Sequence, residues 1–150
     1  KKKYNLLIIL ILFLNHCGFT PIYDNQEKIN FKFNIIDIKG DDEMNNFLNL
    51  QINKYSSKDT VKEIDLNIVT NFKKSILTKN KAGEATSYLL VAEIKFDVVN
   101  STNKRKFVFK EETKTKNIEN KFELKKYESV IKNNFVSSKI EELILRLSVK

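Results

Sequence analysis

The sequence predicts an α+β fold, a two-layer sandwich in which two helices lie on one face of a four-stranded sheet. Four segments alternate apolar and polar residues, as half-buried strands do. Two other segments place apolar residues at helical spacing. Along the 150-residue chain these segments follow the order β-α-β-β-β-α. Because this length suits one domain, we expect a single domain over residues 31–150.

The first strand is expected at Ile29–Lys39, where apolar and polar residues alternate. The alternation changes phase at Ile35 and Ile36, which indicates either a bulge or a strand that is buried on both sides. Gly40 then ends the strand.

The first helix is expected at Asp42–Tyr55. Three acidic residues stand where a helix N-terminus favours negative charge: Asp41, Asp42 and Glu43. The residues after them form one apolar helical stripe: Met44, Phe47, Leu48, Ile52 and Tyr55. We therefore interpret the acidic run as a helix start rather than a metal site.

Three further strands are expected at Glu63–Thr78, Glu84–Val99 and Lys104–Asn117, joined by short turns into an antiparallel meander. The first of them is long for a strand, so we expect it to bend or to project beyond the sheet. In the last, Phe107 and Phe109 are expected to point inward, and the polar end is expected to be exposed to solvent.

The second helix is expected at Lys121–Val149, a segment without Gly or Pro. It carries two apolar stripes that lie nearly opposite each other on a helix drawn at 100° per residue. We expect the helix to break near Asn133 and Asn134. The alternative is one continuous helix that buries one stripe on its own sheet and offers the other elsewhere.

Near the start of the chain, nine apolar residues run from Leu6 to Leu14 after three lysines. A membrane-spanning helix needs about 20 such residues. A basic start, a short apolar run and a cut site describe a signal peptide. The sole cysteine, Cys17, follows at the place where a bacterial lipoprotein is cut and lipidated. We expect residues 1–16 to be a lipoprotein signal peptide and residues 17–30 a lipidated tether.

The residues before Cys17 leave an alternative open. Leu14 fits a lipoprotein cleavage box, but Asn15 and His16 stand where small residues are usual. An ordinary signal peptide near a structural cysteine, or an uncleaved anchor too short to span a membrane, would also fit.

Composition argues against an enzyme. The only histidine, His16, lies in the segment expected to be removed, and Cys17 is the only thiol. The mature domain would therefore lack a Ser-His-Asp site and a His/Cys zinc site. Glu111 and Glu112 are neighbours in a strand and point to opposite faces. We expect no catalytic residues, no cofactor and no bound metal.

Positive charge favours an anionic partner. The net charge is +8, and removal of Lys1, Lys2 and Lys3 with the signal peptide would leave +5 (8 minus 3). A phosphorylated lipid or a membrane face would suit this charge. Two basic clusters flank turns of the meander: Lys79 with Lys81, and Lys104 with Arg105 and Lys106. Because successive turns lie at opposite ends, we expect two separate patches; solvated loop charge is the alternative.

Residues 17–23, with the sequence CGFTPIY, resemble the start of mature LptE, the LPS-assembly lipoprotein family, in its alphaproteobacterial form. The predicted element order is also that of LptE. The resemblance implies a lipid anchor at Cys17 on the periplasmic face of the outer membrane. It further implies that the protein plugs an LptD-like β-barrel, binds lipopolysaccharide (LPS) and assists its insertion into the outer leaflet, without chemistry.

On this resemblance, LPS would bind at Lys104, Arg105 and Lys106, with Lys79 and Lys81 as the second choice. The last apolar stripe, with Leu143, Ile144 and Leu147, would face the barrel. Two other functions stay open. One is a scaffold lipoprotein of another envelope-assembly machine. The other is a basic nucleic-acid-binding domain that stacks bases on strand aromatics, against which the export signal argues; we expect no nucleic-acid partner.

Overall fold

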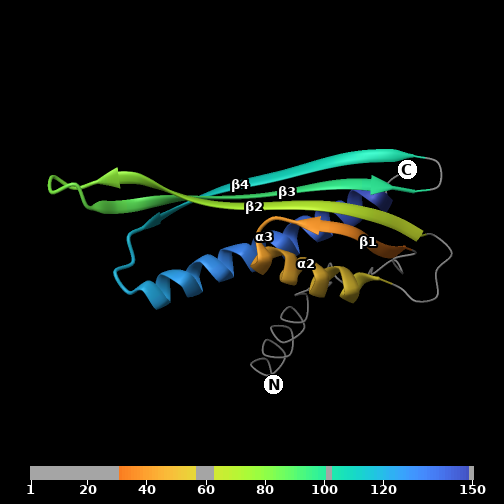
Figure 1. The fold of residues 1–150 in the computed structure, drawn as a ribbon, viewed down its shortest axis with the longest axis horizontal. Helices are drawn as coiled ribbons and strands as arrows, with labels where there is room; N and C mark the ends of the chain where they lie inside the picture. The colour runs from red at the N-terminus through yellow and green to blue at the C-terminus, as the bar shows by residue number, and fades with distance from the viewer. Residues whose placement is uncertain (1–30, 57–62, 101–102, 149–150) are drawn as a thin grey trace, which may run out of the picture.

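The computed structural model describes residues 31–56, 63–100 and 103–148. The observed order is the predicted β-α-β-β-β-α. The elements are β1 (Lys32–Lys39), α2 (Asp42–Tyr55), β2 (Glu63–Lys79), β3 (Ala85–Val99), β4 (Lys104–Lys116) and α3 (Lys121–Ser148). Figure 1 shows both helices on one face of the sheet, so the predicted two-layer α+β sandwich is confirmed.

The four strands lie in the order β1-β2-β3-β4. The pairing of β1 with β2 is parallel, and the other two pairings are antiparallel, as the predicted meander requires. The register of β1 on β2 breaks between Ile35 and Asp37, and the side chain of Ile36 is 63% exposed. The phase change in the sequence is therefore a bulge. The strand begins at Lys32; Ile29 and Asn30, which were predicted to belong to it, lie outside the described residues.

The core lies between the inner face of the sheet and the two helices. Even-numbered residues of β2 and β3 point inward, because side chains alternate along a strand. The sheet contributes the buried Leu66, Ile94 and Phe96, and α2 contributes Met44 and Leu48. In β4, Phe109 is buried and Phe107 packs partly buried against the core, as predicted.

Helix α3 runs without interruption from Lys121 to Ser148, so the predicted break near Asn133 and Asn134 is wrong. The helix contains no Gly or Pro. Asn133 and Asn134 are exposed to solvent and do not interrupt it. All of its buried side chains lie between Lys132 and Leu147, and the apolar ones belong to the same core as α2 and the sheet. The second stripe is buried there, together with Phe135 from the end of the first stripe. The rest of the first stripe, which is Leu124, Tyr127 and Ile131, is only half-buried.

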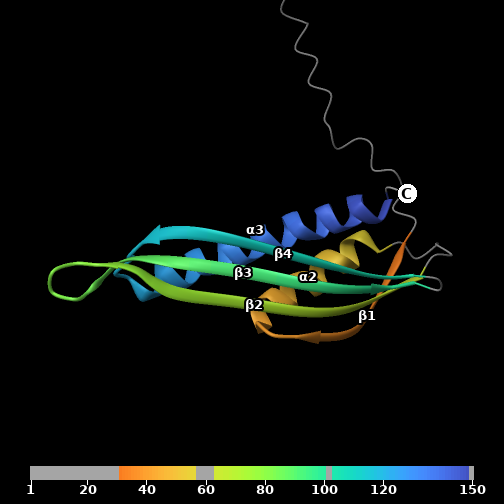
Figure 2. The same cartoon turned by 90° about the horizontal axis from the view of Figure 1, so that it is seen from above.

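The β2–β3 hairpin projects beyond the helices, as the length of β2 predicted (Figures 1 and 2). Along the projecting part, no helix covers the apolar side chains, and they are partly exposed to solvent. Ile76 is 50% exposed, and Leu77 is 42% exposed. The projection leaves the inner face of the hairpin facing the first turns of α3.

Candidate functional site

The two predicted basic clusters lie at opposite ends of the sheet. Lys104 is paired with Val99 at the β3–β4 turn, and Lys79 is paired with Ala85 at the β2–β3 turn. Figure 1 shows these turns at the two ends of the long axis. The expectation of two separate patches is confirmed.

The first-choice cluster is divided between two faces. Lys104 and Lys106 share the outer face of β4, while Arg105 takes the face on which the helices lie. All three side chains are exposed, and Lys106 Nζ lies 3.8 Å from Asp97 Oδ2 on the neighbouring strand. The three cations therefore do not converge on one ligand.

The second-choice cluster stands on an ordered turn. Asn80 accepts hydrogen bonds through its side-chain oxygen from the backbone N–H groups of Ala82 and Glu84, both at 2.9 Å. Gly83 supplies the positive φ of 85° that the turn needs. Lys79 and Lys81 are exposed beside this turn, so the hairpin presents two lysines to solvent from an ordered backbone.

Next to this end of the sheet the structure contains a groove of about 610 Å³ between the hairpin and α3. Three cationic side chains line it: Lys74 of β2, and Lys121 and Lys125 of α3. Tyr88 and Leu124 add apolar surface, and Ile118, Asn117, Glu119 and Glu128 complete the lining. A groove lined by both lysines and apolar side chains suits an anionic amphiphile, since the ammonium groups bind phosphates and the apolar side chains accept hydrocarbon.

One of the three lysines is already engaged. Lys74 Nζ lies 2.6 Å from Glu128 Oε1 and 5.4 Å from the centre of the Tyr88 ring. Among the described residues, no ion pair involves Lys121 or Lys125. These two ammonium groups are therefore the ones available to an anion.

The groove does not appear in the sequence as a motif. Its residues come from β2, β3, the β4–α3 connection and α3. The only local signal is the density of lysines in the first two turns of α3, where a helix N-terminus disfavours positive charge. Such a placement weakens the helix, so helix stability does not account for these lysines.

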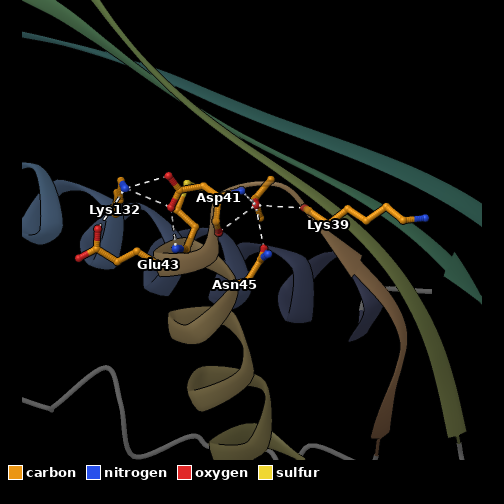
Figure 3. Close-up of polar contacts among 7 residues, drawn as sticks. Lys39, Asp41, Glu43, Asn45 and Lys132 are labelled. Atoms are coloured by element: carbon orange, nitrogen blue, oxygen red, sulfur yellow. Dashed lines mark hydrogen bonds and ion pairs between the residues drawn. The ribbon is translucent and has the colours of Figure 1, made fainter.

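A second polar cluster joins α2, α3 and the sheet (Figure 3). Asp41 caps α2 by accepting a hydrogen bond from the backbone N–H of Met44 at 2.9 Å. Lys132 of α3 donates to Asp41 Oδ2 at 2.8 Å and to Glu43 Oε2 at 3.0 Å. Lys132 is only 8% exposed, and its Nζ also lies 4.6 Å from the centre of the Phe72 ring.

Both charges in this cluster are stabilised. Burial lowers the pKa of Lys132, but its hydrogen bonds to Asp41 and Glu43 outweigh burial, and the net pKa is raised. A hydrogen bond from Ser129, opposed by burial and helped by Lys132, lowers the pKa of Glu43. The charged forms are therefore favoured, as in a structural ion pair.

The buried Thr70 completes this cluster. Its hydroxyl oxygen accepts from the backbone N–H of Asp41 at 2.9 Å and lies 2.8 Å from Asn45 Oδ1, which accepts its proton. Gly40 adopts a φ of 113°, and a Cβ there would lie 1.8 Å from the backbone oxygen of Thr70. Every buried polar side-chain atom in the described part of the chain has a partner. The cluster is thus satisfied, and we assign it to folding.

The structure contradicts the partner-facing prediction. Leu143 is 1% exposed, and Ile144 and Leu147 are each 7% exposed, all within the core. Because α3 stays continuous, its second half packs beside α2 on the same face of the sheet, and this stripe is buried in their common core. These three side chains therefore do not face a partner in the folded domain.

The predicted lipidation site, Cys17, and the tether lie outside the described residues. Within those residues, no helix is long and apolar enough to cross a bilayer, and no cluster of three or more His, Cys, Asp or Glu residues could hold a metal ion.

Comparison with known proteins identifies the fold. No family model matches the sequence, and no curated protein matches it significantly. The chain is similar in structure to rare lipoprotein B from Shewanella oneidensis, with a TM-score of 0.52 and 11% identity over 76% of this chain and 98% of the other. It is also similar to a minor lipoprotein from Acinetobacter baumannii, with a TM-score of 0.54 and 9% identity over 79% and 94% of the two chains. The domain therefore shares a fold with bacterial lipoproteins.

Proposed function

We propose that this protein is an outer-membrane lipoprotein of the LptE kind. It is anchored through Cys17, plugs and supports an LptD-type β-barrel, and assists the insertion of lipopolysaccharide into the outer leaflet. The groove at the projecting end of the sheet carries the proposal, because its lining combines cations with apolar side chains in a domain that shares its fold with bacterial lipoproteins. Lipopolysaccharide offers the matching chemistry: phosphates beside acyl chains.

The geometry changes the order of the proposed binding residues. Lys121 and Lys125 line the groove without an ion pair among the described residues. Lys79 and Lys81 stand at the same end of the sheet, on the hairpin turn. Lys104, Arg105 and Lys106 lie at the other end and point to two faces. We therefore rank the groove and the hairpin turn above the cluster that the sequence favoured.

The binding test uses the full chain and purified lipopolysaccharide. The double variant Lys121→Met and Lys125→Met should weaken binding by at least about tenfold, because each charge-assisted contact contributes about 1.5–3 kcal/mol. The matched control is Lys104→Met with Lys106→Met, which removes the same charge from the other end. Equal weakening by both variants would point to unspecific charge attraction and would contradict the proposed site.

The partner test is a pull-down through a C-terminal tag from the envelope of the native organism. An LptD-like β-barrel should co-purify with the protein. Recovery of a different envelope complex without a barrel would instead favour the scaffold alternative. Mass spectrometry of the mature N-terminus tests the anchor, and an unmodified Cys17 would remove it from the proposal.

A further inference from the structure

The positive charge of the domain is concentrated along one edge of the sheet. Residues 31–150 contain 23 Lys and Arg and 17 Asp and Glu residues, a net charge of +6. Residues 104–126, which span β4 and the start of α3, contain nine basic and four acidic residues, a net charge of +5. The opposite edge, residues 31–56 with β1 and α2, contains three basic and four acidic residues. The strand β4 itself contains six basic and two acidic residues, so +4 of the net charge of +6 lies on this strand.

This edge is long and regular. Among the residues that the structure describes, β4 pairs with β3 on one side and with no strand on the other (Figure 2). It has 13 residues without proline, and its register on β3 is unbroken. By contrast, the other edge strand, β1, has eight residues and a bulge. Natural sheets usually shorten or bulge an exposed edge to prevent pairing, and β4 has neither feature.

The hydrogen-bond pattern shows which β4 residues present their backbone to the free side. At one end of the hairpin Asn100 N–H donates to Asn103, and at the other Asn117 N–H donates to Thr86. Opposed pairs in an antiparallel ladder alternate between bonded and non-bonded. With the observed register, the even-numbered β4 residues are non-bonded to β3. Their N–H and C=O groups therefore point to the free edge.

The same even-numbered residues carry the positive charge. Five of the seven are lysines: Lys104, Lys106, Lys110, Lys114 and Lys116; the other two are Val108 and Glu112. In the described part of the chain, no ion pair involves Lys104, Lys114 or Lys116. A strand added to β4 would place its own residues directly opposite these lysines, with Cα atoms about 5.5 Å away.

Helix α3 leaves these backbone groups uncovered. Two of its contacts with β4 go to inner-facing side chains: Lys139 Nζ lies 3.8 Å from Glu111 Oε2, and the Arg146 guanidinium lies 5.3 Å from the centre of the Phe109 ring. Both partners have odd numbers and bond through their backbone to β3. Among the residues that the structure describes, nothing else packs on the free edge, and the even-numbered β4 residues are exposed there.

We propose that β4 is a docking edge for an acidic β-strand of a partner protein, which extends the sheet and places Asp or Glu opposite the five lysines. Lysines on an edge repel a second copy of the same edge and disfavour apolar strands. The same lysines attract a strand that carries Asp or Glu, so they select for an acidic partner strand. Backbone hydrogen bonds supply affinity, as in other cases of strand addition. The proposal is independent of the lipopolysaccharide groove.

The test measures binding of a dye-labelled 12-residue peptide of alternating Thr and Glu to the full chain at low salt, by fluorescence anisotropy. A peptide with Lys in place of Glu should not bind. The triple variant Lys104→Glu, Lys114→Glu and Lys116→Glu should lose at least about tenfold in affinity. The matched control, Lys73→Glu, Lys79→Glu and Lys81→Glu, makes the same change of charge on β2 and its turn and should stay within about twofold.

A backbone variant separates strand addition from charge attraction. Val108→Pro removes an N–H that points to the free edge, a position where proline is tolerated in an edge strand. It should lose at least about tenfold in affinity, while Val108→Ala, which keeps the N–H, should bind within about twofold of the parent. Circular dichroism and urea unfolding of both variants check that the fold is intact.

Two outcomes would overturn the proposal. If Val108→Pro binds the peptide as well as Val108→Ala does, charge alone holds the peptide and no strand is added. If the peptide fails to bind while phosphatidylglycerol vesicles bind the parent and not the β4 triple variant, the edge serves a membrane surface instead of a protein strand.

Discussion

The ammonium nitrogen of Lys132, in the middle of α3, lies 2.8 Å from the carboxylate of Asp41, the residue that caps α2. The two positions are 91 residues apart in the sequence. One contact therefore fixes the start of α2 against α3 and, through Thr70, against the sheet. The position of both helices on the sheet depends on this cluster as well as on the apolar core.

Replacement of Lys132 by methionine should destabilise the domain by about 2–3 kcal/mol. Loss of one partner leaves a carboxylate without its counter-charge, which costs about 3–5 kcal/mol in a fully buried pair. We expect less here because Glu43 is partly exposed and can be solvated. Urea unfolding measures the change. Lys126→Met, on an exposed position of the same helix, should change stability by less than about 0.5 kcal/mol.

Stability should fall in acid in part through Glu43. Its pKa is lowered in the folded state from the ordinary value of 4.5. A carboxyl with a lowered folded pKa stabilises the fold above its unfolded pKa, and this contribution disappears as pH falls through the folded pKa. The free energy of unfolding of the parent should therefore decrease below about pH 5.

The variant Glu43→Gln should show a smaller decrease in the same pH range. Glu119→Gln, which removes an exposed carboxyl in the β4–α3 connection, serves as the control and should follow the parent. An unchanged acid dependence in Glu43→Gln would show that this carboxylate is not linked to folding.

Gly40→Ala should destabilise the domain more than Gly83→Ala does. Both glycines have positive φ, which costs an alanine about 1–2 kcal/mol. At Gly40 a Cβ would also collide with the backbone of Thr70, whereas nothing lies within 4 Å of a Cβ at Gly83. We expect a loss of more than about 3 kcal/mol for Gly40→Ala and about 1 kcal/mol for Gly83→Ala. Similar losses would mean that the strand–helix turn relaxes around the new methyl group.

Leu143→Asp should unfold the domain, and Leu145→Asp should not. Leu143 is 1% exposed in the core, whereas Leu145, two residues later on the same helix, is 65% exposed. A buried aspartate without a partner costs more than about 4 kcal/mol. Circular dichroism spectra and thermal unfolding compare the two variants. If the Leu143→Asp variant stays folded, Leu143 is not a core residue, and the predicted partner-facing role of this stripe would again be supported.

Much of the fold could be predicted because its signals are local. The alternation in β2 and β3 and the apolar stripe of α2 each come from neighbours along the chain, and their bounds agree with the structure to within one residue. The bulge at Ile36 also appeared as a change of phase. The course of α3 could not be read in this way, because a continuous helix with one buried and one half-buried stripe has the same sequence pattern as two helices joined by a break.

The candidate site was predicted less well than the fold. From the sequence, Lys104, Arg105 and Lys106 ranked as the first candidate for the binding site, and Lys79 and Lys81 as the second. Three adjacent cations form a stronger pattern than two. Alternation along a strand separates adjacent side chains, so this pattern does not make a site. The groove forms where residues of β2 and α3 lie close together in the fold. No spacing within the sequence predicts this proximity.

The sequence by itself determined the order of elements, the inner face of each strand and the net positive charge, because each depends on residue types and their local period. Only the tertiary structure decided where that charge lies and which apolar residues are exposed. It brought Lys132 to Asp41, buried Leu143 between the two layers, and placed the lysine-rich β4 at an edge of the described sheet. These are properties of packing between distant segments, which a local pattern does not contain.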